Sequence, residues 1–179
     1  MFSCSKSYQR LLIALALATC TLGGTYTVAS AQGGSGLVLF GKDDVDVLNY
    51  YLDFGGQAKA RDRYRLRIPG KKLPSGAIKF MISYPDYFDG KFDTDKIEVR
   101  LKGDKKQSLP LREVVWDEER RMVNIELEQP LKKNTKVELV FSNVKNPEVG
   151  TYYFFAQVIP ATDIPAPQQL GAWVLSINP

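Results

Sequence analysis

From residue 61 onward, apolar and polar residues alternate with a period of two, which is typical of half-buried β-strands. Tyr64, Leu66 and Ile68 show the pattern most clearly, because arginines separate them. The same alternation recurs at 78–84, 97–101, 123–127 and 137–141, and a less regular strand is expected at 111–116. A nearly continuous apolar run at 151–159 predicts a central strand covered on both faces, and the segment at 172–177 predicts the last strand.

Short connections rich in turn-forming residues separate these segments, as at Pro69-Gly70 and 73–76. Connections of this length leave no room for crossover helices, so neighbouring strands should pair antiparallel. About seven to eight short strands, with turn signals every 8–12 residues, are the signature of a sandwich or barrel. The sequence therefore predicts an all-β fold, an antiparallel two-sheet Ig-like β-sandwich, over residues 61–179.

Residues 32–60 form a partly flexible N-terminal segment in this interpretation. Its central part, 43–54, fits either a strand or a short helix. In the helix, one face would carry Val45, Leu48, Tyr51 and Leu52. Three acidic residues begin this part: Asp43, Asp44 and Asp46. They suit the positive end of such a helix, and a metal site is the alternative.

The first 31 residues predict a cleavable signal peptide. Lys6 and Arg10 precede an apolar run at 11–17 that is too short to cross a bilayer as a helix. The small-x-small pattern at 29–31 predicts cleavage before Gln32. Two alternatives remain open: an uncleaved membrane anchor, and a lipoprotein modified at Cys20. The predicted location is extracytoplasmic, in the periplasm, in the thylakoid lumen or outside the cell. No later segment is long and apolar enough for a transmembrane helix.

Removal of the leader changes the composition that matters for chemistry. Both cysteines, Cys4 and Cys20, lie within it, and the chain has no histidine. The residues after the leader therefore cannot form a Ser-His-Asp or Cys-His hydrolytic site, and they offer zinc only carboxylate ligands. Basic residues fall from 24 to 22 against 20 acidic ones, so the formal charge drops from +4 to +2. This charge is too small to indicate nucleic-acid binding, and the glycine motifs that cradle nucleotides are absent from the sequence.

The C-terminal half carries a series of short motifs. They are Pro130-Leu131, TKVEL at 135–139, NVKNP at 143–147, GTYYF at 150–154, and LGAW at 170–173 followed by Ile177. Together they resemble a family of small secreted cyanobacterial proteins known only as a domain of unknown function. The resemblance covers most of the chain after the leader and is sharpest from Pro130 onward. It implies an exported Ig-like β domain and carries over no catalytic residues.

One loop, at 85–95 (PDYFDGKFDTD), gathers several candidate ligands. Its carboxylates are Asp86, Asp89, Asp93 and Asp95. They are oxygen ligands of the kind calcium prefers, although their spacing does not match an EF-hand loop. Its aromatic residues, with the one just before it, predict stacking on a carbohydrate instead: Tyr84, Tyr87, Phe88 and Phe92. The third interpretation is a solvated turn whose aromatic side chains belong to the core.

A basic stripe runs along the polar face of one strand, at Arg61, Arg63, Arg65 and Arg67. A row of guanidinium groups suits phosphate, sulfate, anionic lipid or anionic polysaccharide. Two structural explanations compete with binding. The stripe would keep an edge strand from pairing with another chain, or it would pair with glutamates on other strands. The candidate glutamates are Glu98, Glu126, Glu128 and Glu138.

We therefore predict an exported, non-enzymatic binding or scaffold domain of the cell envelope. Its partner would be an envelope protein or an anionic or glycan ligand. We expect no cofactor, with calcium as the one alternative. One alternative is a carboxylate-dependent enzyme acting on polysaccharide, which needs two converging carboxyl groups about 5–10 Å apart. Another is a purely structural envelope subunit, which needs an open edge strand or a large apolar face.

Overall fold

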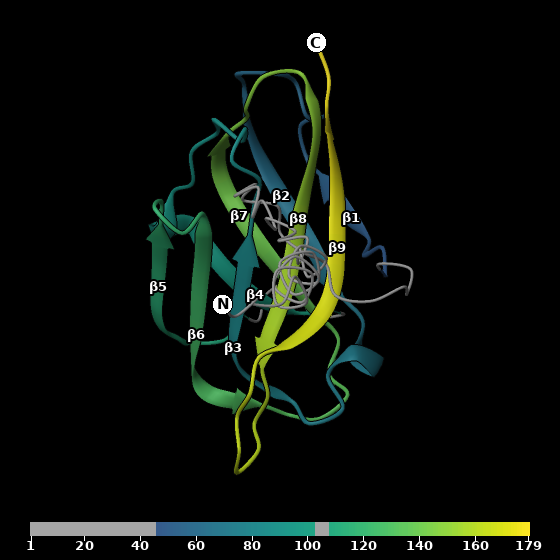
Figure 1. Cartoon of the computed structure of the whole chain (residues 1–179), viewed down its shortest axis with the longest axis vertical. Coiled ribbons are helices and arrows are strands. Elements are labelled where there is room, and N and C mark those ends of the chain that lie inside the picture. The colour runs from purple at the N-terminus through teal and green to yellow at the C-terminus, as the bar shows by residue number, and fades with distance from the viewer. Residues whose placement is uncertain (1–45, 103–107) are drawn as a thin grey trace, which may run out of the picture. The chain divides into compact units, whose positions relative to one another are not determined.

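The computed structural model describes residues 46–102 and 108–179, which form two antiparallel β-sheets packed face to face (Figure 1). The strands are β1 (Tyr50–Leu52), β2 (Arg61–Ile68), β3 (Ala77–Ser83), β4 (Ile97–Leu101), β5 (Leu111–Asp117), β6 (Met122–Leu131), β7 (Val137–Lys145), β8 (Gly150–Ile159) and β9 (Gln168–Ile177). Two 3-10 turns complete the elements, η1 (Gly70–Lys72) and η2 (Thr94–Lys96). The predicted fold class, an Ig-like two-sheet sandwich, is confirmed.

One sheet has four strands in the order β1-β2-β7-β4, and the other has five in the order β5-β6-β3-β8-β9. The part of the chain that was ambiguous in sequence is a strand where it pairs, because Tyr50–Leu52 forms β1 against β2. The described residues, 46–102 and 108–179, belong to one compact unit. The sandwich therefore includes described residues before 61, where the sequence placed its start. The predicted signal peptide at 1–31, Cys20 within it, and Asp43 and Asp44 lie outside the described residues.

The core lies between the sheets and follows the period-two pattern. Tyr64, Leu66 and Ile68 of β2 are buried, while the arginines between them point outward. Trp173 of β9 is fully buried, and its indole Nε1 donates to the carbonyl oxygen of Arg67 at 3.3 Å. Each large apolar side chain buried in this way contributes on the order of 1.5–3 kcal/mol relative to exposure. The inward faces of both sheets thus hold the fold without a disulfide among the described residues.

Two buried polar residues organise the loops at one end of β2. The Asp62 carboxylate accepts hydrogen bonds from the backbone amides of Phe54 and Gly56, at 2.9 and 2.8 Å. The Asn146 side chain accepts from the Tyr64 hydroxyl at 2.7 Å and donates to a carbonyl oxygen of the same loop. Because buried polar groups are costly without partners, these bonds fix the loop that leads from β1 to β2.

The outer edge of β9 is covered by residues 46–58, which we call the edge strap. Ala172 exchanges two backbone hydrogen bonds with it, to Asp46 and from Leu48, at 2.9 and 2.7 Å. Gly171 makes this approach possible, since a Cβ there would lie 2.2 Å from the Asp46 carbonyl oxygen. Its φ of 138° also lies in the region that favours glycine. No helix among residues 46–102 and 108–179 is long and apolar enough to cross a membrane.

Candidate functional site

The outer face of the four-stranded sheet is built by strand alternation and cross-strand register. On β2 the side chains between the buried residues point outward, so Arg65 and Arg67 lie on this face. Arg67 stands opposite Glu138 of β7, and Glu138 stands opposite Arg100 of β4. The next row pairs Arg65 with Val140. Three strands therefore bring their charged side chains to one surface.

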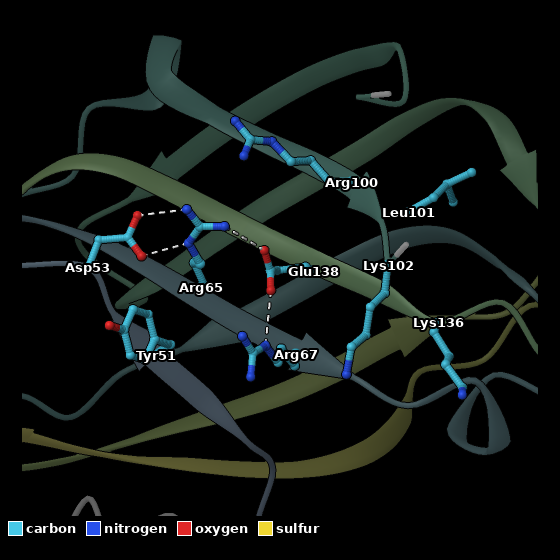
Figure 2. Close-up of a pocket in the computed structure, with 9 residues that line it drawn as sticks. All are labelled: Tyr51, Asp53, Arg65, Arg67, Arg100, Leu101, Lys102, Lys136 and Glu138. Atoms are coloured by element: carbon cyan, nitrogen blue, oxygen red, sulfur yellow. Dashed lines mark hydrogen bonds and ion pairs between the residues drawn. The ribbon is translucent and has the colours of Figure 1, made fainter. Parts of the chain in front are cut away.

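A continuous set of ion pairs links these side chains (Figure 2). Arg65 makes a two-point contact with Asp53, at 2.6 Å from Nε and 2.8 Å from the terminal nitrogen Nη2. Its other terminal nitrogen, Nη1, lies 3.3 Å from Glu138. The second oxygen of Glu138 accepts from Nε of Arg67 at 3.0 Å. Since each carboxylate is held by arginine, the side chains of this face have fixed positions.

Val140 shows how closely the arginines cover this face. It points outward from β7, because both of its neighbours point into the core, yet it is fully buried. Its cross-strand neighbours are Arg65 and Glu98. Long aliphatic stems of arginine cover apolar surface while the guanidinium group stays in water. The charged layer therefore packs against the sheet as well as facing solvent.

A groove of about 590 Å³ crosses this surface. It is lined by Tyr51, Asp53, Arg65, Arg67, Arg100, Leu101, Lys102, Lys136 and Glu138 (Figure 2). Tyr51 lies on the β1 side, and Lys102 and Lys136 lie toward the other end (Figure 2). A second depression of about 240 Å³ adjoins the groove, because Arg67, Lys102 and Lys136 line both. We call the two together the basic groove.

Positive charge dominates the basic groove, with five cationic side chains against the carboxylates of Asp53 and Glu138. The hydrogen bond from Arg65 lowers the pKa of Asp53 below its ordinary value, and desolvation opposes this only in part. At the rim, the hydrogen bond from Arg100 likewise lowers the pKa of Glu98. Both carboxylates therefore stay ionised at neutral pH. The arrangement suits the binding of an anion and provides poor proton donors.

The predicted arginine stripe is divided by the structure. Arg65 and Arg67 line the groove, whereas Arg61 donates to Asn143 and Arg63 to Ser142, both outside the groove lining. The proposed protection of an edge strand is wrong, because β2 lies between β1 and β7. Pairing with glutamate does occur. Of the four glutamates named as candidate partners, Glu138 alone forms ion pairs with these arginines. Binding of a ligand by the stripe stays a prediction.

The carboxylates of the 85–95 loop do not gather around one point. Asp89 pairs with Lys59 at 2.5 Å, and Asp93 accepts from the Asn143 side chain at 2.7 Å. Asp86 and Asp95 form no ion pair with any residue in the part of the chain that the structure describes. Among the residues that the structure describes, no three acidic groups lie close enough to hold a metal ion. The geometry therefore gives the suggested calcium site no support, and the loop is tied to its neighbours by ordinary polar contacts.

The aromatic residues of the same loop lie mostly inside. Phe88 and Phe92 are buried and stacked, with ring centroids 5.3 Å apart. Tyr84 is buried beside them, and its hydroxyl accepts a hydrogen bond from the Trp116 indole at 2.7 Å. Tyr87 alone of the suggested sugar-stacking residues is exposed, and its hydroxyl reaches the Thr151 carbonyl oxygen at 3.3 Å. The burial of Phe88 and Phe92, each 7% exposed, therefore argues against sugar stacking on their rings.

Most groove residues were not singled out by sequence reasoning. Tyr51, Asp53, Arg100, Lys102 and Lys136 all lie outside the predicted stripe. The outward positions of Arg100, Lys102 and Lys136 follow from alternation on β4 and near β7, which was visible in the sequence. What was missing was the order of the strands, which places β4 and β2 on either side of β7. A charge pattern compared across all strands would have been the available signal.

Solved structures with a similar arrangement share little sequence with this chain. A bacterial hydrophobin, BslA, matches with 11% identity and a TM-score of 0.48, over 76% of this chain and 97% of its own. A collagen-binding domain from a Staphylococcus aureus adhesin matches with 8% identity and a TM-score of 0.45, over 76% and 100%. An uncharacterised Nocardia farcinica protein with an immunoglobulin-like fold matches with 10% identity and a TM-score of 0.40, over 73% and 96%.

Comparison at the level of sequence gives one match. No curated protein matches the chain. A family model described as "Protein of unknown function (DUF2808)" matches residues 37–177. The match spans the whole sandwich, including the edge strap and every residue that lines the basic groove.

Proposed function

The chain belongs to the DUF2808 family of proteins of unknown function, and we propose that it is a non-enzymatic binding domain of the cell envelope that holds an anionic ligand in its basic groove. The observation that carries the proposal is the excess of positive charge in the groove. Five cationic side chains meet there, three from strands β2 and β4 and two from the loop positions just after β4 and just before β7, and both carboxylates are already paired with arginine. Such a recess concentrates field lines and attracts anions.

Two features make the groove ready for a ligand. Arg67 uses its Nε for Glu138, and its terminal nitrogens donate to no other residue that the structure describes. Lys136 is exposed and forms no ion pair within that same part of the chain. Side chains that are held in place lose little conformational freedom when a ligand binds, so less of the interaction energy is spent on ordering.

Binding is favoured over catalysis by the state of the groove carboxylates. A glycosidase-type mechanism needs one carboxyl group with a raised pKa to donate a proton. The pKa of Asp53 moves in the opposite direction, because Arg65 stabilises its charged form. Glu138 is likewise held by two arginines, at 3.3 and 3.0 Å. The enzyme alternative therefore lacks an acid in this groove.

The cell-envelope location rests on the predicted signal peptide. Cleavage before Gln32 would release a product without cysteine, which needs no oxidative step to fold. Protein purified from the extracytoplasmic fraction should therefore have the intact mass of a chain that begins at Gln32. A product that keeps residue 1 would contradict the location without affecting the groove.

Charge reversal in the groove tests the proposed function. The variant Lys102→Glu/Lys136→Glu reverses the charge of two exposed lysines. The two residues are neighbours, because the Lys102 amide donates a hydrogen bond to the Lys136 carbonyl oxygen at 3.0 Å. The matched control Lys79→Glu/Arg120→Glu makes the same charge change at residues that do not line the groove. The probe is linear polyphosphate, measured by calorimetry at low and moderate salt.

We expect wild-type protein to bind polyphosphate with an affinity that falls with added salt. The groove variant should lose about tenfold or more in affinity, and the control less than about threefold. Equal losses in both variants would indicate attraction by net charge alone and would contradict a groove-specific site. Absence of binding by the wild-type protein would contradict the proposal as well.

A further inference from the structure

The basic groove is elongated and open, which bears on the kind of anion it would hold. Its larger part is bounded by Tyr51 on β1 and by Lys102 and Lys136 at the other end (Figure 2). The smaller depression continues past Arg67 to Asn49 of the edge strap. A single small ion would occupy a fraction of this space. A chain-like ligand would contact both parts at once.

The three arginines of the groove are recessed, although Lys102 and Lys136 are exposed, and this argues against a flat anionic surface as the ligand. The side chain of Arg65 is 21% exposed, that of Arg100 19% and that of Arg67 38%. A bilayer surface would meet the rim of the groove before it reached these guanidinium groups. A slender chain can lie along the floor, and it can bring one charge to each cation in turn.

Tyr51 adds a group that no purely electrostatic site requires. It lies opposite Arg65 on the neighbouring strand, lines the groove, and is 55% exposed. An aromatic ring beside cations presents a flat apolar face together with a hydroxyl group. Sugars offer the complementary surface, because one side of the ring carries C–H groups while the edges carry hydroxyls. Asn49 offers an amide in the adjoining depression for such hydroxyls.

Strand geometry also sets the spacing of the cations. Neighbouring strands lie about 5 Å apart, and outward residues on one strand recur about every 7 Å. Arg67 and Arg100 flank Glu138 across three strands, and Lys102 follows Arg100 by two residues. A polymer with one charge on each repeating unit can contact these cations one after another, whereas a compact anion can contact one of them.

On the basis of the proposed anion-binding function, we propose that the ligand class is an acidic polysaccharide, with carboxylate or sulfate groups on its sugar units. The sugar chain lies along the basic groove, with one sugar ring stacked on Tyr51. Its charged groups pair with Arg67, Arg100, Lys102 and Lys136. Asp53 and Glu138 hold the arginines in position and do not contact the sugar as acids.

The test compares two polyanions and two tyrosine variants. The probes are an oligomer of galacturonic acid, its neutral methyl ester, and linear polyphosphate as a polyanion without sugar. The variant is Tyr51→Ala, and the matched control is Tyr153→Ala, which removes a tyrosine that is 46% exposed on β8 of the other sheet. Thermal unfolding of each variant checks that the fold is kept, and vesicles with anionic phospholipid form a further probe.

We expect oligogalacturonate to bind at least about tenfold more tightly than its methyl ester. Tyr51→Ala should weaken oligogalacturonate binding about fivefold to tenfold and leave polyphosphate binding nearly unchanged, and Tyr153→Ala should change neither. The polysaccharide assignment would be overturned, with anion binding left intact, if Tyr51→Ala changed the affinity for both polyanions equally or changed neither affinity.

Groove-dependent binding to vesicles, at an affinity equal to that for oligogalacturonate, would also overturn it. If the groove variant Lys102→Glu/Lys136→Glu binds all probes as the wild-type protein does, both proposals fail.

Discussion

The two sheets share the same alternation of inward and outward side chains, but their outer faces differ in chemistry. On the four-stranded sheet the outward side chains form a linked layer of arginine, glutamate and aspartate around the basic groove (Figure 2). On the five-stranded sheet the outward residues include exposed Val115 and Tyr153, and the ion pair from Arg112 to Glu126 is isolated. Apolar exposure of this scattered kind is normal for a soluble surface. The alternation of strands thus decides which residues face outward, and their chemistry decides whether a site results.

Two valines make the contrast concrete. Val140 points outward from β7 and is fully buried, because charged side chains lie over it. Val115 lies on β5, opposite Asn124 of β6, and is 41% exposed. Val140 lies on an inner strand between Arg65 and Glu98, whereas Val115 lies on an edge strand with one neighbouring strand. The difference teaches that long charged side chains on both flanking strands can cover an outward apolar residue. Side chains packed in this way are held in position, as a binding groove requires.

The largest expected effect concerns Gly171, where the edge strap joins the two sheets. The strap closes the edge of the five-stranded sheet and also supplies Leu48 and Asn49 to the groove wall. Gly171→Ala should destabilise the protein by about 2–4 kcal/mol, because the new Cβ would meet the Asp46 carbonyl oxygen at 2.2 Å and φ is 138°. Urea unfolding measures this change. The variant should also weaken polyphosphate binding, since part of the groove wall moves.

The control for this variant is Gly55→Ala, which has a φ of 82° and no atom within 4 Å of the new Cβ. Backbone strain alone should cost about 1 kcal/mol there. If both variants lose the same stability, the close approach of the strap to β9 contributes nothing.

An intermediate effect is expected from removing one carboxylate on each face. Glu138→Gln leaves Arg67 without a charged partner and leaves Arg65 with Asp53 alone, at a side chain that is 13% exposed. The expected loss is about 1–2 kcal/mol, because the site is partly shielded from solvent. Glu126→Gln on the other face should cost less than about 0.5 kcal/mol, since its partner Arg112 is 64% exposed. Chemical denaturation of both variants gives the comparison, and similar losses would show that the two faces do not differ in this respect.

The smallest expected effect is a difference in acid sensitivity. Arg65 lowers the pKa of Asp53 below its ordinary value of 3.8, so the native state binds fewer protons than the unfolded state in this region of pH. The stabilisation from Asp53 is therefore complete above the ordinary pKa and is lost as pH falls from there through the lower folded-state pKa. Asp53→Asn should be less stable than the wild-type protein at neutral pH and should show a shallower loss on acidification. Thermal unfolding across an acid pH series measures both, and an unchanged acid slope would argue against the Asp53–Arg65 pair.

The strands themselves were predictable because the core demands a strict alternation. Tyr64, Leu66 and Ile68 form the apolar face of β2, and no helical period competes with that pattern. The segment that contains β1 was ambiguous, since a strand of three residues carries too little periodic signal. Its structure is decided by hydrogen bonds to β2, the next strand along the chain, and to β9, which lies far away in the sequence.

The candidate site was predictable only in part. Alternation indicated that Arg65 and Arg67 share one face, but the partners on β4 and β7 depend on the order of the strands, which the sequence does not state. The aspartate loop shows the opposite error. Asp89 and Asp93 are close in sequence, yet each is drawn to a different neighbour, Lys59 and Asn143. Nearness along a loop does not make side chains converge, because each carboxylate follows its own local partner.

The edge strap ties the completion of the sandwich to both ends of the described chain. Asp46 and Leu48 contact Ala172, and Gly56 contacts Asn178, so each contact joins residues that are synthesised far apart in time. A chain still emerging from a ribosome has its first β segments but no β9 to receive them. The outer edge of the five-stranded sheet is therefore completed only after β9 has emerged.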